Sequence, residues 1–352
     1  MELHKILIIS FGYLLLMISI LPLVRLDHWF FRVFEYPRVQ KLIINILVLA
    51  AFVSLFEFKN LHDSLFSAFL TVNAGYLMFQ VYPFTSIAQK QMINTFKHNP
   101  DRSISLFIGN VFQYNRKAKE YLESVTSVDP DVIMLVETDN WWAQKAEIFK
   151  ETHPHQLLVP LENTYGMILY SKFELIDGKV KYLVEEGIPS VHACIKLPSG
   201  EKIRFHGLHP TPPVPGENPR STERDKEILL IAKSSKKSDL PVIVAGDLND
   251  VAWSYTTQLF SKVSGLLDPR RGRGFFNTFH AKYRLFRYPL DHIFCSTDFT
   301  LLDIKRMPNC GSDHFPMFIR LQYEPKAAAI HEEPVADAED LELAEEKINK
   351  VT

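Results

Sequence analysis

The sequence predicts a single α/β domain over residues 100–323, preceded by three membrane-spanning helices. Residues 1–84 form a block of apolar runs, whereas residues 100–323 alternate short β-branched runs with helical stretches and turn residues. Residues 324–352 are rich in Ala, Asp and Glu. These shifts in composition divide the chain into a membrane region, a linker at 85–99, one soluble domain and an acidic tail.

The membrane region contains three runs without charged residues, at Ile6–Val24, Leu42–Phe56 and Ser64–Tyr82. The first run is close to the roughly 20 residues that a helix needs to cross the hydrocarbon core of a bilayer. Three such runs in one block are typical of transmembrane helices. A cleaved signal peptide fits poorly, because no small-x-small cleavage site follows the first run and two further apolar runs come after it.

The basic residues that flank these helices indicate an orientation. The first connection is rich in them, whereas the second carries only Lys59. Those of the first connection are Arg25, Arg32, Arg38 and Lys41. Because basic connections tend to stay in the cytoplasm, this count puts the first connection and the large domain there. Lys5, before the first helix, favours the opposite orientation.

Short apolar segments in the middle of the chain predict buried or half-buried strands. They are Ser103–Ile108, Val132–Val136, Met167–Tyr170, His192–Leu197, Ile203–Leu208, Val242–Ala245, His292–Cys295 and Met317–Leu321. Lys117–Val125 and Thr222–Lys233 predict helices. Strands interspersed with helices over this length indicate one α/β domain rather than two.

Composition argues against several classes of protein. The net charge of -2 does not suit a free-standing nucleic-acid binder, which usually carries a strong basic excess. Cys194, Cys295 and Cys310 are far apart and include no Cys-x-x-Cys pair, which argues against a disulfide framework and a thiolate zinc site. The acidic tail lacks apolar residues for a core, so we expect it to be solvated, disordered or only marginally helical.

Polar residues follow the predicted strands, where a scaffold presents catalytic groups. They are Asn110, Glu137, His209, Asp247 with Asn249, and Asp313 with His314. Taken alone, Asp247 and Asn249 would also fit an Asx turn, and Glu137 would fit a helix-capping carboxylate. Five strand ends in a row with such residues instead predict one shared site.

The residue types at these strand ends suit the cleavage of phosphate esters. Mg²⁺ and Mn²⁺ take oxygen ligands, which the carboxylates of Glu137 and Asp313 supply. Asp247 can orient and deprotonate an attacking water. Asn249, two residues later, can donate its amide N–H to phosphate.

Histidines at two of the strand ends complete this chemistry. His314 and His209 can donate hydrogen bonds to the charge that develops on the phosphoryl group. A nearby carboxylate would keep such a histidine oriented and protonated, and Asp291 is the candidate. His206 lies three residues before His209 on the same predicted strand and so points the opposite way, which indicates a structural role.

The same residues resemble the motifs of the endonuclease/exonuclease/phosphatase superfamily. Gly246-Asp-Leu-Asn249 is similar to its Gly-Asp-x-Asn motif, and Gly311-Ser-Asp-His314 to its Ser-Asp-His signature. Val136-Glu137 resembles the metal-binding Gln-Glu position, with Val in place of the usual Gln. Further matches are Leu290-Asp-His-Ile-Phe294, Tyr165-Gly-Met-Ile-Leu-Tyr-Ser171, Asn110 and His209. The order and spacing hold from about Ser103 to Leu321, which is essentially the whole soluble domain.

This resemblance implies a four-layer α/β sandwich, in which two packed mixed β-sheets are flanked by helices. It implies that Glu137 binds metal, helped by Asn110 and Asp313. It also implies a base at Asp247 and stabilisation of the transition state by His209 and His314. We count Asn110 and Asn249 as candidate substrate contacts as well.

Three membrane helices ahead of such a domain resemble the bacterial membrane branch of the superfamily, which includes proteins linked to glycopeptide-antibiotic resistance. The Pro-rich stretch His209-Pro-Thr-Pro-Pro-Val-Pro215 is similar to that branch. The branch is generally thought to hold its catalytic domain outside the cytoplasmic membrane, against the count of basic residues. On this resemblance we expect a protein of the bacterial inner membrane whose catalytic domain lies outside the cytoplasm.

The segment before Asp291 combines basic and aromatic side chains. They are Arg270, Arg271, Arg273, Lys282, Arg284 and Arg287, with Phe275, Phe276, Phe279 and Tyr283 between them. Such a segment can grip nucleic-acid strands, or the head group of a phospholipid or polyprenyl phosphate at a membrane surface. Because the chain is tethered to a bilayer, we favour the second and expect Arg271 and Arg273 to bind substrate. A plain solvated loop is the remaining alternative.

The sequence therefore predicts a membrane-anchored phosphoesterase that uses Mg²⁺ or Mn²⁺ and hydrolyses a phosphate ester or pyrophosphate, with a lipid-linked substrate favoured. A membrane-tethered endonuclease or exonuclease that acts on DNA or RNA with the same residues is the alternative. A third hypothesis is an inactive binding or scaffold domain. It predicts the loss of a metal ligand or base, whereas all the expected polar positions are filled. No feature of the sequence indicates an oligomeric state.

Overall fold

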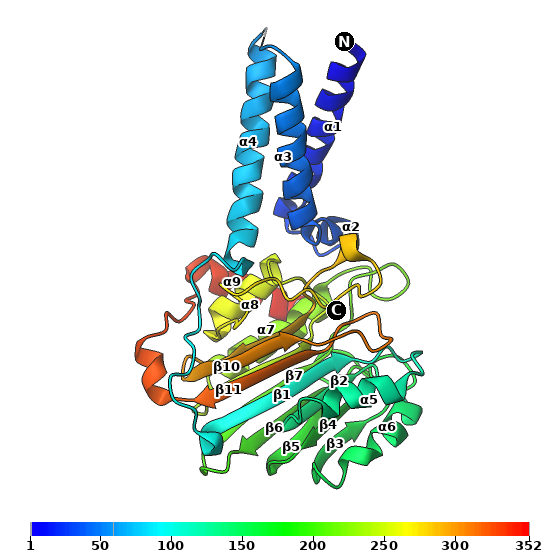
Figure 1. Cartoon of the computed structure of the whole chain (residues 1–352), viewed down its shortest axis with the longest axis vertical. Helices are drawn as coiled ribbons and strands as arrows, with labels where there is room; N and C mark the ends of the chain where they lie inside the picture. The colour runs from blue at the N-terminus through cyan, green and yellow to red at the C-terminus, as the bar shows by residue number, and fades with distance from the viewer. Residues whose placement is uncertain (1, 59, 352) are drawn as a thin grey trace.

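The soluble part of the chain folds as a four-layer α/β sandwich, which confirms the predicted fold class. The computed structural model describes residues 2–58 and 60–351, so Lys59 lies outside the described residues. Figure 1 shows the sheets and their covering helices at the base of three long helices, which project together from one end of the molecule.

Two mixed sheets form the inner layers of the sandwich. The first has six strands in the order β10-β11-β1-β2-β4-β3, and the second has five in the order β5-β6-β7-β8-β9. The strands of the first sheet are β1 (Ser103–Asn110), β2 (Val132–Val136), β3 (His155–Val159), β4 (Met167–Ser171), β10 (Phe299–Arg306) and β11 (Met317–Tyr323). Those of the second are β5 (Leu175–Lys181), β6 (Ser190–Lys196), β7 (Lys202–Leu208), β8 (Val242–Asp247) and β9 (Asp291–Cys295).

The main hydrophobic core lies between the two sheets. In β2, Val132, Met134 and Val136 point into this core, whereas Ile133 and Leu135 point to the outer face of the sheet. Both faces are buried because helices cover the outside of each sheet. Central strands that are buried on both faces need continuous apolar runs, and this is the pattern that predicts them from sequence.

Helices on the outer faces complete the four layers. The six-stranded sheet carries α5 (Ala118–Thr126) and α6 (Asn140–Ala146). The five-stranded sheet carries α7 (Thr222–Lys236), α8 (Tyr255–Ser264) and α9 (Ala338–Asn349). The two predicted helices correspond to α5 and α7.

The N-terminal region contains three helices that are long and apolar enough to cross a membrane. They are α1 (Glu2–Ile20), α3 (Arg38–Leu55) and α4 (Leu61–Val81). Asn73 Nδ2 donates to Asn45 Oδ1 at 2.8 Å, and Asn45 Nδ2 donates to the Leu70 carbonyl at 2.8 Å. Such bonds between polar side chains and neighbouring helices help to hold a membrane bundle together.

The ends of these helices pack directly on the soluble domain. Leu77 and Phe84, at the end of α4, join one apolar cluster with Trp253 and Leu290 of the sandwich. Arg38, at the start of α3, donates through Nη1 to the Trp253 carbonyl at 2.7 Å. The connection between α1 and α3, which contains the short helix α2 (Trp29–Arg32), therefore lies on the same side of the bundle as the large domain.

Residues 85–99, which we expected to form a linker, run along the sandwich. The Thr95 amide donates to the Leu301 carbonyl at 2.9 Å, at the edge strand β10. Asn94 Oδ1 accepts a hydrogen bond from Arg273 Nη2 at 2.6 Å. The segment is thus attached to the domain along its length and does not act as a free spacer.

The acidic tail, which we expected to be solvated, disordered or only marginally helical, contains helix α9 (Ala338–Asn349). Asp337 caps this helix by accepting a hydrogen bond from the Asp340 amide at 2.9 Å. Lys347 is buried, and its Nζ donates to Asp27 and to Asp225, at 2.8 Å in each case. Composition could not reveal this order, because the buried partners of Lys347 lie in α7 and in the connection after α1.

We expect Lys347→Met to lower the free energy of unfolding by about 3 kcal/mol. The substitution removes the buried ammonium group that pairs with the carboxylates of Asp27 and Asp225. Chemical unfolding of the detergent-solubilised protein measures this. Lys350→Met is the matched control, because Lys350 contacts the same Asp27 at 2.5 Å but is 42% exposed. A partly exposed ion pair contributes less than about 1 kcal/mol. Equal and small losses in both variants would show that the Lys347 pair does not hold α9 in place.

Candidate active site

The polar strand-end residues from both sheets converge at one edge of the sandwich. Asn110 is the last residue of β1, Glu137 follows β2, and Asp247 is the last residue of β8. β1 and β2 are parallel neighbours, as are β7 and β8, so their carboxyl ends meet at this edge. The Asn110 amide joins the two sheets, because its Nδ2 donates to Glu137 Oε1 at 2.6 Å and to Asp247 Oδ2 at 3.2 Å.

Glu137 is held in an unusual backbone conformation. Its φ of 59° lies in the left-handed region, which non-glycine residues rarely adopt and which often marks functional sites. Its Oε2 accepts a hydrogen bond from the Gln113 amide at 3.2 Å. Burial raises the pKa of Glu137, the hydrogen bond from Asn110 opposes this rise, and the nearby Asp313 adds to it.

His314 lies between two buried carboxylates. Its Nδ1 is 2.8 Å from Asp291 Oδ2, and its Nε2 is 3.5 Å from Asp247 Oδ2. Asp247 and Asp291 are directly opposite in the antiparallel pair of β8 and β9, so the sheet itself fixes their separation. The sequence-based expectation that a carboxylate at Asp291 orients a histidine agrees with this geometry.

The two carboxylates keep His314 positively charged. Burial alone would lower its pKa, but Asp247 and Asp291 outweigh burial and raise the pKa to about 10. Burial raises the pKa of Asp247 to about 7, against the opposing effect of His314. The pKa of Asp291 is lowered: burial would raise it, but the charge and hydrogen bond of His314 prevail. The cluster therefore combines a fixed cation with a carboxyl group that can exchange a proton near neutral pH.

His209 lies close to this cluster but differs from the expectation of a protonated residue. It is buried against Tyr165, with the two ring centroids 5.3 Å apart. Burial lowers its pKa to about 3, and the charge on His314 contributes. Asp291, the candidate carboxylate for keeping a histidine protonated, forms its ion pair with His314, and no ion pair joins His209 to a carboxylate among the described residues. His209 is therefore neutral and can act only through an N–H of its uncharged ring.

Asn249 links the cluster to the membrane connection. Its φ of 51° turns the chain sharply after β8, and its amide nitrogen donates to Asp247 Oδ1 at 3.0 Å. Its side-chain Nδ2 donates to the Pro210 carbonyl at 3.0 Å, beside His209. Its carbonyl accepts hydrogen bonds from Tyr36 Oη at 2.9 Å and from Arg224 Nη1 at 2.7 Å.

The charge of the cluster fits a divalent cation. Four carboxylates, of Glu137, Asp247, Asp291 and Asp313, gather near one imidazolium. Among residues 2–58 and 60–351, Asp247 and Asp291 form ion pairs with His314, whereas Glu137 and Asp313 form none. Oxygen atoms of Asp247 and Asp291 and a nitrogen of His314 lie within 4.8 Å of one another and could also hold a cation. The imidazolium of His314, however, already supplies positive charge to these two carboxylates. Glu137 and Asp313 are both partly open to solvent, and carboxylates are the ligands that hard cations take.

Asn110, which we expected to help bind the metal, uses both polar atoms of its side chain in hydrogen bonds within the protein. Its Oδ1 accepts a hydrogen bond from the Phe112 amide at 2.8 Å, and its Nδ2 bonds two carboxylates. These contacts orient Glu137 and Asp247 toward each other. Asn110 therefore acts here as a positioning residue.

Arg271 and Arg273 do not join the cluster, contrary to our expectation of substrate contacts. Arg271 Nη2 donates to Gln258, and its guanidinium lies 5.5 Å from the centre of the Phe84 ring. Arg273 Nη2 donates to the Met92 carbonyl at 2.6 Å. Both side chains contact the membrane junction or the segment after α4, because that segment packs against the turn at 268–273.

Three further residues support the cluster, and the sequence analysis assigned none of them a role in the site. Thr278 Oγ1 accepts a hydrogen bond from the Asp291 amide at 3.2 Å. Arg270 Nη1 donates to the Asp291 carbonyl at 3.1 Å. Ser312 Oγ donates to the Asn110 carbonyl at 2.8 Å and accepts from the His314 amide at 3.0 Å. Only Ser312 had a signal in the sequence, as part of the Ser-Asp-His motif.

Solved structures share the architecture of this chain. TDP2 of D. rerio, humanised by 14 mutations, is 16% identical with a TM-score of 0.52, over 63% of this chain and 99% of that one. An endonuclease/exonuclease/phosphatase from Beutenbergia cavernae is 15% identical with a TM-score of 0.51, over 63% and 72%. The human nocturnin catalytic domain, with a bound sulfate anion, is 15% identical with a TM-score of 0.50, over 64% and 100%. At such identities these likenesses show the fold alone.

The family itself is shown by sequence. No curated protein matches the chain. The sequence pattern of the endonuclease/exonuclease/phosphatase family, however, matches residues 110–314, which is more than half of the chain. The match begins at Asn110 and ends at His314, the first and last residues of the cluster described above. Members of this family are hydrolases that act on phosphate ester bonds and generally use divalent metals. This chain belongs to the endonuclease/exonuclease/phosphatase family.

Proposed function

We propose that this hydrolase cleaves a phosphate ester or pyrophosphate on a lipid-linked substrate at the surface of the membrane. The observation that carries the proposal is the hydrogen bond from Tyr36 Oη to the Asn249 carbonyl, at 2.9 Å. Tyr36 lies two residues before α3, and Asn249 lies two residues after Asp247. A helix rises about 1.5 Å per residue, so the cluster lies within a few residues of the membrane-spanning segment.

A loop beside the cluster supports the same location. Tyr283, Leu285 and Phe286 are largely exposed, which is unusual for three large apolar side chains in one short loop. The Leu285 carbonyl accepts a hydrogen bond from Gln40 Nε2 at 2.6 Å, in the first turn of α3. Exposed aromatic and aliphatic side chains at this level suit the interface between lipid and water. The loop leads directly to Asp291.

The cluster would act on phosphate through complementary groups. Asp247 orients the attacking water and accepts its proton, and His314 donates a hydrogen bond to a non-bridging oxygen as negative charge builds up. His209 can donate through its neutral ring, and the second amide hydrogen of Asn249 is free for the substrate. Asp291 positions His314 and keeps it protonated.

We propose Mg²⁺ or Mn²⁺ as the cation, held by Glu137 and Asp313. A bound divalent cation would neutralise charge on the phosphoryl oxygens. Asn110 fixes the carboxylate of Glu137 for this purpose through the 2.6 Å bond to Oε1.

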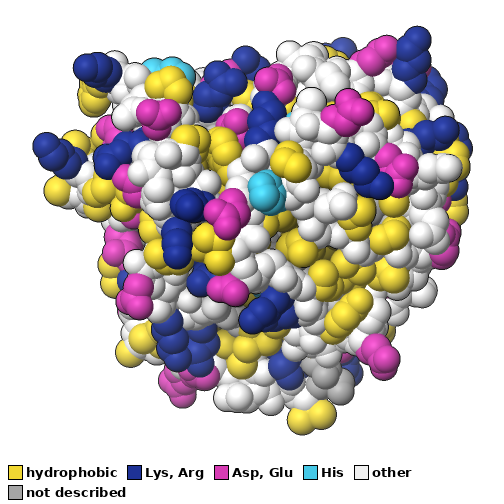
Figure 2. All heavy atoms as spheres, turned by 90° about the horizontal axis from the view of Figure 1, so that it is seen from below, with side chains coloured by type: hydrophobic (Ala, Val, Ile, Leu, Met, Phe, Trp, Pro, Cys, Tyr) yellow, Lys and Arg dark blue, Asp and Glu magenta, His cyan; other side chains and the backbone are white. Residues whose placement is uncertain are grey.

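The alternative of a membrane-tethered nuclease has less support. Figure 2, which views the molecule from the end opposite the long helices, shows basic and acidic side chains interspersed rather than a continuous basic track. The net charge is -2. Nucleic-acid affinity depends on many contacts between Lys or Arg and phosphate, and neither the net charge nor this face, which lies away from the catalytic cluster, supplies a basic excess for them.

The test is to assay the purified full-length protein with Mg²⁺ against a lipid phosphate, a lipid pyrophosphate, plasmid DNA and RNA. We expect turnover of a lipid substrate in mixed micelles, lost on chelation with EDTA. Asp247→Asn purified in parallel controls for contaminating phosphatases. Robust cleavage of DNA or RNA with no lipid turnover would favour the nuclease, and no turnover of any phosphate ester would favour a scaffold.

The pH dependence of turnover tests the role of His314. The protonated form is stabilised by Asp247 and Asp291, so activity that needs it is present below the pKa of about 10 and is lost as pH rises through that value. Asp291→Asn removes one stabilising charge, lowers the pKa of His314 and shifts the alkaline limit of kcat to lower pH by about 1–2 units. Rate profiles at saturating Mg²⁺ measure this shift. An unchanged alkaline limit would assign it to another group.

We further propose that the catalytic domain lies outside the cytoplasm of a bacterial cell. Three of the four basic residues that favour the opposite side, Arg32, Arg38 and Lys41, are buried within the protein. Arg32 pairs with Glu35 at 3.3 Å, and Lys41 donates to the Phe34 carbonyl at 2.8 Å. Basic residues that are buried and bonded in this way are weak guides to orientation. A topology reporter fused after Tyr323 tests the assignment.

A further inference from the structure

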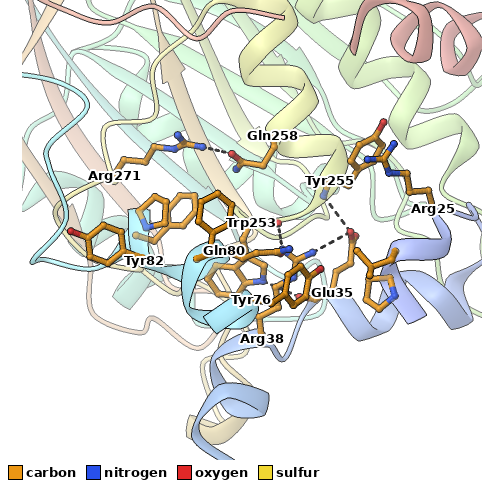
Figure 3. A pocket seen from close by; sticks show the side chains of 15 residues that line it. Arg25, Glu35, Arg38, Tyr76, Gln80, Tyr82, Trp253, Tyr255, Gln258 and Arg271 are labelled. Atoms are coloured by element: carbon orange, nitrogen blue, oxygen red, sulfur yellow. Dashed lines mark hydrogen bonds and ion pairs between the residues drawn. The ribbon is translucent and has the colours of Figure 1, made fainter. Parts of the chain in front are cut away.

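A cavity of about 430 Å³ lies where the membrane helices meet the soluble domain, and we call it the junction pocket. Leu23 and Phe79 contribute to its walls from the ends of two membrane helices, and Trp253 and Gln258 contribute from the sandwich. Figure 3 shows Arg271 and Arg25 reaching toward the pocket from opposite sides. None of Glu137, Asp247 or His314 lines it, so it is separate from the catalytic cluster.

The lining of the junction pocket carries excess positive charge. Three arginines, Arg25, Arg38 and Arg271, face one glutamate, Glu35. Glu35 is already engaged within the protein, since its carboxylate oxygens lie 3.3 Å from Arg32 and 3.6 Å from Arg38. The unneutralised charge therefore belongs to Arg25 and Arg271.

Arg25 and Arg271 are available for a ligand. The ion pair that Arg25 makes with Glu339 is long, at 3.5 Å, and its side chains are 51% and 81% exposed, so it is weak. The Arg25 guanidinium stacks 4.6 Å from the centre of the Tyr255 ring, which holds it at the pocket. Arg271 Nη2 donates to Gln258, but its Nε is buried and has no partner among the described residues.

Two more polar atoms in the same lining lack a partner. Gln80 Oε1 and Tyr255 Oη are buried without a hydrogen bond in the described part of the chain. A buried polar atom without a partner is costly, and these three belong to residues that line one cavity, so small movements of their side chains would let a polar ligand satisfy them. A donor, an acceptor and a hydroxyl together suit a phosphate group that carries a hydroxyl-bearing substituent.

The junction pocket also opens onto the lipid-facing surface of the helices. Leu23 is 55% exposed and Phe79 is 80% exposed, and both lie at the ends of apolar membrane-spanning segments. A free phosphate ion would leave these apolar side chains uncovered. A lipid with two acyl chains would cover them while its head group contacts the arginines.

We propose that the junction pocket binds an anionic phospholipid, with its phosphate between Arg25 and Arg271 and its acyl chains along Leu23 and Phe79. This lipid is a retained ligand rather than a substrate, because no catalytic residue lines the pocket. It bridges the membrane helices and α8, and so holds the catalytic domain against the bilayer. The proposal does not depend on which phosphate ester the enzyme hydrolyses.

Native mass spectrometry of the full-length protein tests the proposal, after equal amounts of phosphatidylglycerol and phosphatidylcholine are added to the detergent-purified protein. We expect phosphatidylglycerol to be retained over phosphatidylcholine by roughly tenfold, as for a charge-assisted hydrogen bond. Arg25→Gln with Arg271→Gln should abolish this preference. Arg102→Gln is the matched control, since Arg102 pairs with Glu201 outside the junction pocket, and it should retain the preference.

Two further arms make the result decisive. Arg25→Gln alone alters a half-exposed side chain, so it tests the pocket even if the double variant fails to fold, and it should reduce the preference severalfold. Glycerol 3-phosphate, added as the soluble head group, should not raise the unfolding temperature as phosphatidylglycerol does. Equal retention of both lipids by the wild type, an unchanged preference in Arg25→Gln, or equal stabilisation by glycerol 3-phosphate would each overturn the proposal. No readout contains a catalytic step, so failure here leaves the proposed hydrolysis untouched.

Discussion

Asp247→Asn is expected to reduce kcat by about 10³-fold while leaving the fold intact, because loss of a general base typically costs 10²–10⁴-fold. The amide has the shape of the carboxylate and can still accept the hydrogen bond from Asn110, but it cannot take a proton from water. Burial raises the pKa of Asp247 and so disfavours its ionised form in the folded protein. The neutral amide removes that penalty, and we expect an unfolding temperature equal to or above that of the wild type.

Steady-state rates and thermal unfolding, measured on the same preparations, separate catalysis from stability. Asp303→Asn is the control, because Asp303 lies on the edge strand β10 and pairs with Lys305. It makes the same chemical change outside the cluster, and we expect wild-type turnover. A kcat for Asp247→Asn within tenfold of the wild type would show that another group accepts the proton.

Glu137→Gln is expected to weaken Mg²⁺ binding by roughly 100-fold. Loss of a residue that only supports a metal ligand lowers the metal affinity by about 10- to 100-fold, and we expect loss of a ligand itself to reach the upper end of that range. The substitution removes one of the two carboxylates that are partly open to solvent. The single amide oxygen of Gln can keep only one of the two hydrogen bonds that Glu137 accepts, from Asn110 Nδ2 or from the Gln113 amide. Isothermal titration with Mg²⁺ measures the affinity without any substrate. High Mg²⁺ should restore part of the activity of Glu137→Gln but none of that of Asp247→Asn.

Glu162→Gln is the matched control for this experiment. Glu162 contacts the same neighbour as Glu137, because its carbonyl accepts a hydrogen bond from Gln113 Nε2 at 3.1 Å. Its carboxylate, however, bonds Asn140 at 2.9 Å and is not part of the cluster. Unchanged Mg²⁺ affinity in both variants would place the cation elsewhere, for instance between Asp247 and Asp291.

The strands that could be predicted from sequence differ from the others in their burial. The eight predicted strands correspond to β1, β2, β4, β6, β7, β8, β9 and β11, which are buried along most of their length. The three that escaped prediction are β3, β5 and β10, and each lies at an edge of its sheet. These three edge strands are partly exposed and carry polar side chains such as Gln156, Lys179 and Asp303, so no apolar run marks them. The edge strand β9 is buried along its length, and its apolar run did predict it.

The candidate site was predictable where its residues follow strands in recognisable motifs. Asn110, Glu137, Asp247 and His314 form one connected network, as their positions at strand ends indicated. The environment of each side chain was not predictable. The sequence does not show which of His314 and His209 pairs with Asp291. It also does not show that burial leaves His209 neutral.

Contacts between remote parts of the chain set the remaining limits. Lys347 and its partner Asp27 are 320 residues apart, so the tail composition alone suggested disorder. Arg271 and Arg273 precede Asp291 in the chain, which suggested substrate binding, but their side chains turn to the segment after α4. Both errors arose because sequence proximity and composition do not encode tertiary partners.

The hydrogen bond from Tyr36 to the Asn249 carbonyl holds the catalytic cluster at a fixed distance from the membrane-spanning helices. The reactive groups of the enzyme cannot travel outward as they could on a flexible stalk. For the lipid-linked substrate that we propose, the encounter with the enzyme would become a two-dimensional search within the plane of the leaflet. The enzyme would then select substrates by the height of their phosphate above the bilayer as well as by their chemistry. Molecules whose phosphate projects farther from the bilayer would not reach the catalytic cluster.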